Sequence, residues 1–178
     1  EHTDHIIVHT DEGRRYLCEH YKLSNESKII VARHGHYIGC YKDNLSIYQA
    51  RDSFGLKEDQ IHFVFLGQVR PYKGVEQLIE AFNKLALQYQ NLKLTIAGSF
   101  PDKAYKQQLH NIISSQASDL ITFEEGFVKD DELQRYIKAS DFVVLPYKKI
   151  LTSGSILLAL SFSAPVIATK CEVVDDLI

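Results

Sequence analysis

The chain has 178 residues, of which 45% are hydrophobic, and its formal net charge is -3. This length fits one domain with some flanking material, and the composition is typical of a globular protein with a core rather than of a disordered chain. The small negative charge provides no long-range positive field, so no nucleic-acid partner is predicted.

The first part of the chain predicts a short α/β unit followed by an irregular segment. His5–His9 is typical of a strand, and Thr10 supplies the N-cap of a helix that runs to about Tyr21. Lys28–Ala32 predicts a second strand. Arg33–Asn44 then carries two glycines and no periodicity, so we interpret it as a domain boundary.

The rest of the chain predicts a regular alternation of strands and helices. Short apolar runs predict strands at Ile61–Leu66, Leu92–Ala97, Leu120–Phe123, Phe142–Leu145 and Val166–Ala168. Helix patterns fall at about Ser46–Phe54, Val75–Gln90, Asp102–Gln116, Asp131–Ser140 and Gly154–Phe162. Short strands separated by helices pair in parallel through right-handed crossovers. Because the strands are almost continuously apolar, we predict an α/β fold, a Rossmann-like parallel sheet with helices on both faces.

Two of these helices should pack differently. The first has an apolar stripe at three- and four-residue spacing, formed by Val75, Leu78, Ile79, Phe82, Leu85, Ala86 and Tyr89. Its opposite face, which includes Asn83, should be solvated. The helix from Gly154 has almost no polar side, so we expect it to lie buried between the sheet and structure outside this chain.

Two cations follow the first of the five strands, in Gly67-Gln-Val-Arg-Pro-Tyr-Lys-Gly74. In an open α/β sheet, ligands bind outside the carboxyl ends of the strands, so we predict that Arg70 and Lys73 clamp a diphosphate. The alternative is a pair of exposed cations on an ordinary loop. The loop fits neither the Walker A pattern nor G-x-G-x-x-G, which disfavours ATP hydrolysis and NAD chemistry.

A second anion site is predicted at Leu151-Thr-Ser-Gly-Ser155, before the apolar helix. Thr152 or Ser153 can cap this helix, and the free amides around Gly154 would then face an anion. An ordinary capped helix with nothing bound is the alternative. Gly98 ends another strand, where it either lets a ligand approach the backbone or only supplies the turn.

The sequence gives little support to metal or disulfide chemistry. His34, His36 and Cys40 have a spacing that can begin a zinc site, but no fourth ligand follows, and there is no Asp-x-Asp motif to hold a donor through a metal. We therefore expect no metal and no other cofactor. Cys18, Cys40 and Cys171 are odd in number and far apart, which predicts reduced thiols, with two of the three buried among apolar neighbours.

The sequence holds no signal peptide and no apolar run of about 18 residues, which predicts a cytoplasmic protein that is at most peripheral to a membrane. It also lacks methionine, even at position 1. We interpret it as a piece of a longer polypeptide.

Five stretches resemble the carboxyl-terminal, donor-binding domain of GT-B glycosyltransferases of the family 4, or group 1, type. They are Phe65–Gly74, Leu94–Gly98, Gly126–Val128 with Asp131–Leu133, Ala139–Pro146 and Ala164–Ala168, in the family's order and spacing. The segment His5–Tyr37 resembles the end of the family's amino-terminal, acceptor-binding domain and its hinge. The resemblance implies that residues 1–37 end that domain and that residues 38–178 form a donor-binding domain, incomplete at its end. The isolated chain should then not catalyse transfer.

The resemblance also implies roles for single residues. Lys73, with Arg70, would neutralise the diphosphate leaving group, residues around Phe127 and Val128 would face the base, and the helix from Gly154 would meet the phosphates. The remaining predicted donor-binding residues are Gly67, Gln68, Gly98, Thr152, Ser153 and Ser155.

The sequence departs from the family pattern at donor contacts. Gln68 stands where the family has an arginine, and Ser163 lies near the position of a family glycine. Ile150 and Leu158 occupy the positions of two glutamates, the second of which holds the ribose hydroxyls in the family. Either Thr152–Ser155 replaces these contacts or the site has lost donor binding.

We therefore predict a glycosyltransferase that moves a sugar from a UDP- or GDP-sugar to a saccharide or lipid-linked acceptor, in the assembly of a surface polysaccharide or glycolipid. The alternative is a non-catalytic GT-B-like module that binds a nucleotide or a protein partner, which the absent glutamates would explain. An epimerase on the same fold has less support, because no acid–base groups are evident.

Overall fold

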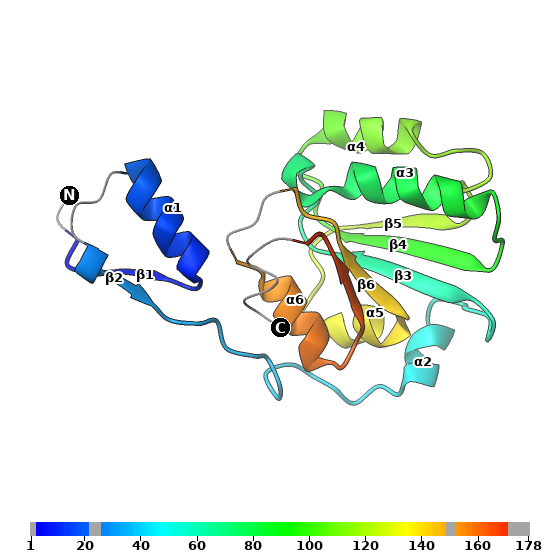
Figure 1. Cartoon of the computed structure of the whole chain (residues 1–178). Helices are drawn as coiled ribbons and strands as arrows, with labels where there is room; N and C mark the ends of the chain where they lie inside the picture. The colour runs from blue at the N-terminus through cyan, green and yellow to red at the C-terminus, as the bar shows by residue number, and fades with distance from the viewer. Residues whose placement is uncertain (1–2, 22–25, 149–151, 171–178) are drawn as a thin grey trace.

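The computed structural model describes residues 3–21, 26–148 and 152–170. Its amino-terminal unit consists of β1 (Ile6–Val8), α1 (Asp11–Tyr21), η1 (Glu26–Lys28) and β2 (Ile29–Val31). The two strands pair in parallel, and α1 packs against them (Figure 1). The helix begins as predicted, because the Thr10 hydroxyl accepts a hydrogen bond of 3.0 Å from the Gly13 amide.

A five-stranded sheet forms the larger part of the structure, in the order β5-β4-β3-β6-β7. Its strands are β3 (Ile61–Leu66), β4 (Leu92–Gly98), β5 (Ile121–Glu125), β6 (Phe142–Leu145) and β7 (Val166–Ala168). Every pair of neighbours is parallel. The chain builds from β3 toward β5 and then returns to the other side of β3, so the strand order reverses between β3 and β6. The predicted fold class is confirmed.

Helices cover both faces of the sheet, as predicted. They are α2 (Ile47–Asp52), α3 (Val75–Ala86), α4 (Lys103–Asn111), α5 (Leu133–Ala139) and α6 (Gly154–Ser161), with the short 3-10 helix η2 (Pro71–Lys73) before α3. Figure 1 shows α3 and α4 on one face and α5 and α6 on the other, with α2 beside α5. Each of the five helices predicted beside this sheet exists, but each is shorter than its pattern.

Helix α3 buries most of its predicted stripe. Its buried side chains are Val75, Leu78, Ile79, Phe82 and Ala86. Leu85 and Tyr89 are instead 39% and 52% exposed, and Tyr89 lies beyond the end of the helix at Ala86.

The end of helix α4 is set by a side chain of α3. Asn83 donates through Nδ2 to the Ile112 carbonyl at 2.6 Å, and its Oδ1 accepts from the Ser114 amide at 3.0 Å. These bonds replace the backbone bonds that would continue α4, so the helix ends at Asn111 rather than near Gln116. The prediction that Asn83 faces solvent is wrong, since the residue is half-buried between two helices.

Helix α6 is buried on its sheet side, where Ile156 and Ala159 are each 1% exposed. The segment around Tyr37 contacts α6 as well, and Leu160 is 43% exposed. Neither Cys18 nor Cys40 is buried, so the predicted burial of two cysteines is wrong. Cys171 lies outside the described residues.

A histidine lies in the centre of the sheet. His62 on β3 is fully buried, and its Nδ1 lies 3.0 Å from the Ala139 carbonyl while its Nε2 lies 2.8 Å from the Thr95 hydroxyl. A carbonyl can only accept, so Nδ1 carries the proton and Nε2 accepts from Thr95. Burial lowers the pKa of His62 to about 4, and the neutral imidazole therefore joins β3, β4 and α5 at neutral pH.

Candidate functional site

The carboxyl ends of three neighbouring strands form the base of the candidate site. Gly67, Gly98 and Gly126 lie at or just after the ends of β3, β4 and β5. The Gly67 amide donates to the Ala97 carbonyl and the Gly126 amide to the Gly98 carbonyl, both at 3.0 Å. Gly98 has a φ of +144°, and a Cβ there would lie 1.9 Å from the Gly67 carbonyl oxygen. Only glycine therefore allows these two strand ends to approach so closely.

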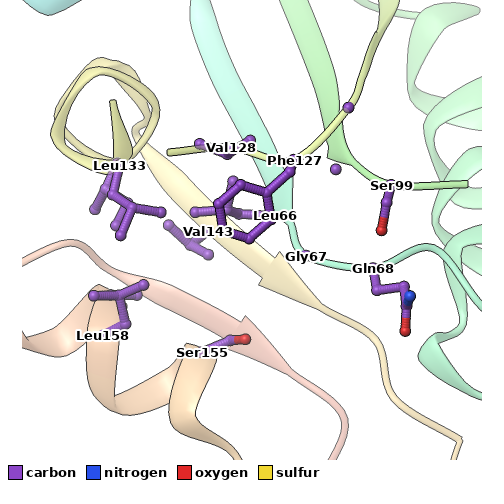
Figure 2. A pocket seen from close by; sticks show the side chains of 14 residues that line it. Leu66, Gly67, Gln68, Ser99, Phe127, Val128, Leu133, Val143, Ser155 and Leu158 are labelled. Carbon is purple, nitrogen blue, oxygen red and sulfur yellow. The ribbon is translucent and has the colours of Figure 1, made fainter. Parts of the chain in front are cut away.

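A cavity of about 340 Å³ opens beside these strand ends (Figure 2). It is lined by Leu66, Gly67, Gln68, Gly98, Ser99, Gly126, Phe127, Val128, Leu133, Ile137, Val143, Ser155, Leu158 and Ala159. The volume lies within the range of small-molecule sites. Because β3 and β6 both contribute, the cavity lies where the strand order reverses, which is the usual ligand position in open α/β sheets.

Most of the cavity wall is apolar. Helix α5 contributes Leu133 and Ile137, and helix α6 contributes Leu158 and Ala159. Phe127 is 83% exposed, and Figure 2 shows its ring in front of Leu66. An exposed aromatic ring beside an apolar cavity provides a surface on which a planar group can stack.

Polar side chains are few in the lining. Gln68 and Ser99 lie together at one end of the cavity, after β3 and β4, and Ser155 lies on the first turn of α6 (Figure 2). A small number of hydroxyl and amide groups in an apolar wall is the arrangement that orients a small molecule.

Arg70 contacts a residue that lines the cavity. Its Nε donates to Gln68 Oε1 at 2.7 Å, so the guanidinium lies beside a lining residue although Arg70 does not line the cavity itself. The side chain is exposed.

Lys73 lies on the same loop and does not line the cavity either. Its ammonium lies 4.1 Å from the centre of the Tyr147 ring and 5.4 Å from that of Tyr72. Among the residues that the structure describes, neither Lys73 nor Arg70 forms an ion pair with a carboxylate. Within these residues, no carboxylate competes with a ligand for either cation.

The described residues of the predicted second anion site, at the start of α6, do not all line the cavity. Ser153 is the N-cap, since its buried hydroxyl accepts from the Ile156 amide at 3.2 Å. Ser155 faces the cavity, whereas Thr152 is exposed and does not line it. A Cβ on Gly154 would lie 3.0 Å from the Tyr37 hydroxyl, so this residue packs against the segment that leads from β2.

Six of the predicted site residues thus line one cavity: Gly67, Gln68, Gly98, Phe127, Val128 and Ser155. The structure places Arg70 and Lys73 on the loop that adjoins it, and Thr152, Ser153 and Gly154 at the start of α6 outside the lining. The sequence did not predict Ser99, Leu133 or Tyr147. Ser99 directly follows the strand-ending Gly98 and could have been included, but no pattern marks the other two.

The described part of the chain contains neither a cluster of metal ligands nor a membrane-spanning helix. In the ranges 3–21, 26–148 and 152–170, no three His, Cys, Asp or Glu side chains gather as a metal site. None of the helices in those ranges has the length and apolarity needed to cross a bilayer.

Comparison with known proteins matches residues 46–178 to the family model "Glycosyl transferases group 1". The chain is 32% identical over 146 residues to a GDP-mannose:glycolipid 4-beta-D-mannosyltransferase of Xanthomonas campestris pv. campestris, covering 78% of this chain and 36% of that protein. It is 31% identical to an alpha-monoglucosyldiacylglycerol synthase of Acholeplasma laidlawii, covering 70% of this chain and 31% of that protein. The chain thus spans about a third of the length of these relatives.

The fold is also that of solved structures. The Anabaena protein HepE, crystallised in complex with UDP and glucose, superposes with a TM-score of 0.83 at 20% identity, over 99% of this chain and 47% of that one. The family match covers most of the chain, including every strand of the five-stranded sheet. This chain therefore belongs to the group 1 glycosyltransferases, with a GT-B fold, and the resemblance found in its sequence is confirmed.

Proposed function

We propose that the chain is the donor-binding part of a glycosyltransferase that moves a sugar from a UDP- or GDP-sugar to an acceptor. The observation that carries this proposal is the cavity at the carboxyl ends of β3, β4 and β5, next to a loop whose two cations have no carboxylate partner in the described residues. In this arrangement an apolar cavity, which suits the base of a nucleoside diphosphate, lies next to positive charge, which suits its phosphates.

Each part of the donor has a matching part of the site. Phe127 and Val128 would contact the base, and Ser155 and the first turn of α6 would lie toward the phosphates. Lys73 and Arg70 would neutralise the negative charge that develops on the nucleoside diphosphate as it leaves. We assign this role to side chains rather than to a metal, because the sequence has no Asp-x-Asp motif.

The relatives support a lipid-linked acceptor. One is named as acting on a glycolipid and another as a diacylglycerol glycoside synthase. We therefore propose a role in glycolipid or surface polysaccharide assembly, in the cytoplasm and with peripheral association to a membrane.

We further propose that residues 1–37 belong to a second α/β unit. Their strands form a sheet separate from the five-stranded one, and Ile7 and Ile30, which are register partners on the two strands, are 65% and 46% exposed. Apolar side chains of this kind favour contact with further structure of a longer enzyme, in which the acceptor site would be completed.

Leu158 favours the alternative function, that of a non-catalytic nucleotide-binding module. It lines the cavity at the position where the family resemblance leads one to expect a glutamate, so no carboxylate is available there for ribose hydroxyls. The other position, Ile150, lies outside the described residues.

Adding UDP, GDP and their sugars to the chain tests the proposal, with binding measured by calorimetric titration and stability by the melting temperature. A nucleotide at about 100 times its dissociation constant should stabilise the fold by roughly 2.7 kcal/mol, which is visible as a rise in melting temperature. Lys73→Ala should weaken binding roughly ten- to a hundredfold, since a charged contact to phosphate is lost.

Lys148→Ala is the matched control. This lysine lies beside the same loop, but its ammonium is 3.5 Å from a Glu76 carboxylate oxygen, so its loss should change nucleotide affinity little. Equal affinity of the Lys73→Ala variant and the unaltered chain would disprove the clamp. No response to any of the nucleotides would contradict donor binding altogether.

A further inference from the structure

Two lysines, Lys73 and Lys148, lie at the same corner of the molecule, and among the described residues only Lys148 has an acidic partner. Lys148 forms an ion pair with Glu76, with an N–O distance of 3.5 Å. The Lys73 ammonium instead lies over the rings of Tyr147 and Tyr72, at 4.1 Å and 5.4 Å from their centres. Both distances are within the range of cation–π attraction.

The two rings differ in how firmly they are held. Tyr147 is 5% exposed, whereas Tyr72 is 48% exposed. Tyr147 directly follows Pro146 at the end of β6 and belongs to the packed core, so its ring is a fixed surface for the ammonium.

Backbone contacts join the loop that carries Lys73 to the segment that carries Tyr147. The Lys148 amide donates to the Tyr72 carbonyl at 2.9 Å. Gly74, in the left-handed region with a φ of +74°, lies so close to Pro146 that a Cβ would be 1.8 Å from the Pro146 carbonyl oxygen. The backbones of residues 72–74 and 146–148 are therefore in direct contact, which places Lys73 beside Tyr147.

An aromatic face and a carboxylate hold an ammonium in different ways. A carboxylate cancels the charge and takes up N–H donors, and a ligand must displace it. The face of a ring attracts the cation through its quadrupole but carries no net charge. A lysine held in this way stays in place and keeps its charge and its donors for an incoming anion.

We propose that Tyr147 is a positioning residue, whose ring holds the Lys73 ammonium ready for the diphosphate of the donor. This inference rests on the proposed function and adds a residue to it. The ring carries the role rather than the hydroxyl, because the buried Tyr147 hydroxyl has no hydrogen-bond partner in the part of the chain that the structure describes.

Substitutions at position 147 separate the ring from the hydroxyl. Tyr147→Phe keeps the face and should bind GDP and UDP within twofold of the unaltered chain, as measured by calorimetry. Tyr147→Leu removes the face and should weaken binding about three- to tenfold. If Tyr147→Phe loses as much affinity as Tyr147→Leu, the hydroxyl is the active group and the inference is wrong.

A double-mutant cycle distinguishes positioning from general damage to the fold. In a Lys73→Ala background, Tyr147→Leu should cause no further loss of affinity, because its effect acts through the lysine. An additive loss would overturn the inference. A ring-fluorinated phenylalanine at position 147 covers the case in which the leucine variant does not fold, since it keeps the shape of the ring and weakens its negative face. Binding equal to that of the phenylalanine variant would then also contradict the role.

The same measurements keep this inference distinct from the proposed function. If Lys73→Ala has no effect, the diphosphate clamp itself fails. If Lys73→Ala weakens binding while Tyr147→Leu does not, the clamp stands and only the role of Tyr147 is lost.

Discussion

At the scale of single residues, His62 shows how a polar side chain can sit in the core without charge. Its two ring nitrogens bond to the Ala139 carbonyl and the Thr95 hydroxyl, so the neutral form is fully satisfied. Protonation would place a second donor against the Thr95 hydroxyl and a charge in an apolar interior. The fold therefore depends on this imidazole staying neutral.

This dependence predicts a loss of stability in mild acid. Burial lowers the pKa of His62 from 6.5 to about 4 in the folded state, so between these pH values the unfolded chain binds the additional proton. The contribution is fully present above pH 6.5, and roughly 3 kcal/mol of it should be lost as the pH falls to about 4. Urea unfolding across this range measures it.

The chain contains seven other histidines, so the control is a variant. His62→Gln lowers stability at pH 7 but should flatten the dependence on pH relative to the unaltered chain. An unchanged slope in this variant would show that His62 does not carry the effect.

Gly74 offers a second test at this scale. Gly74→Ala adds a Cβ at 1.8 Å from the Pro146 carbonyl oxygen, on a residue whose φ is +74°. Gly39 has a similar φ of +77° but nothing within 4 Å of a Cβ. Gly39→Ala should therefore destabilise by only about 1 kcal/mol, from its left-handed conformation. Gly74→Ala should destabilise more and should also weaken nucleotide binding, and equal effects would disprove the close packing.

At the scale of elements, helices α3 and α4 are joined by Asn83. The side chain of α3 ends α4 by bonding to the Ile112 carbonyl and the Ser114 amide. The hydrogen bonds from α3 therefore determine where α4 ends, and they also hold the turn that leads to β5.

Asn83→Ala should therefore destabilise the fold by roughly 1–3 kcal/mol, because two partly buried backbone groups lose their partner. Chemical denaturation measures this change, and hydrogen exchange at Ser114 should rise. The exposed neighbour Lys84 provides the control, since Lys84→Ala should change stability by less than about 0.5 kcal/mol. Similar effects of the two substitutions would contradict the role of Asn83.

At the scale of the whole molecule, the segment between the two sheets is attached to helices α6 and α5. The Tyr37 amide donates to the Ser161 hydroxyl on α6 at 2.9 Å. Farther along, Gln134 on α5 is buried, and its Oε1 accepts from the amides of Asn44 and Leu45 at 2.9 and 3.0 Å. The amino-terminal unit is thus tied to the helices beside the cavity (Figure 1).

Gln134→Leu should remove the acceptor of two amides of this segment, while Lys138 on α5 still donates to the Leu45 carbonyl at 2.6 Å. The Asn44 and Leu45 amides lose their acceptor, so their hydrogen exchange should rise by at least tenfold while the β3 and β4 amides stay protected. Gln107→Leu on the exposed side of α4 is the control and should leave the segment unchanged. Protection that persists in the Gln134 variant would disprove the attachment.

Local pattern was sufficient for much of the fold and for part of the site. The apolar runs gave each strand of the five-stranded sheet, and glycine at the strand ends gave Gly67 and Gly98, because strand periodicity and turn chemistry depend on neighbours in sequence. Helix ends were less accurate. Asn83 shows why, since its partners belong to another helix.

Sequence alone was sufficient for the family, the parallel α/β class and the loop that carries Arg70 and Lys73. The three-dimensional arrangement was needed to show that Leu133 lines this site and that the Lys73 ammonium lies over the Tyr147 ring. The physical reason is that the cavity forms where strands distant in the chain become neighbours, and a side chain's partners across a sheet depend on strand order, which local periodicity does not specify.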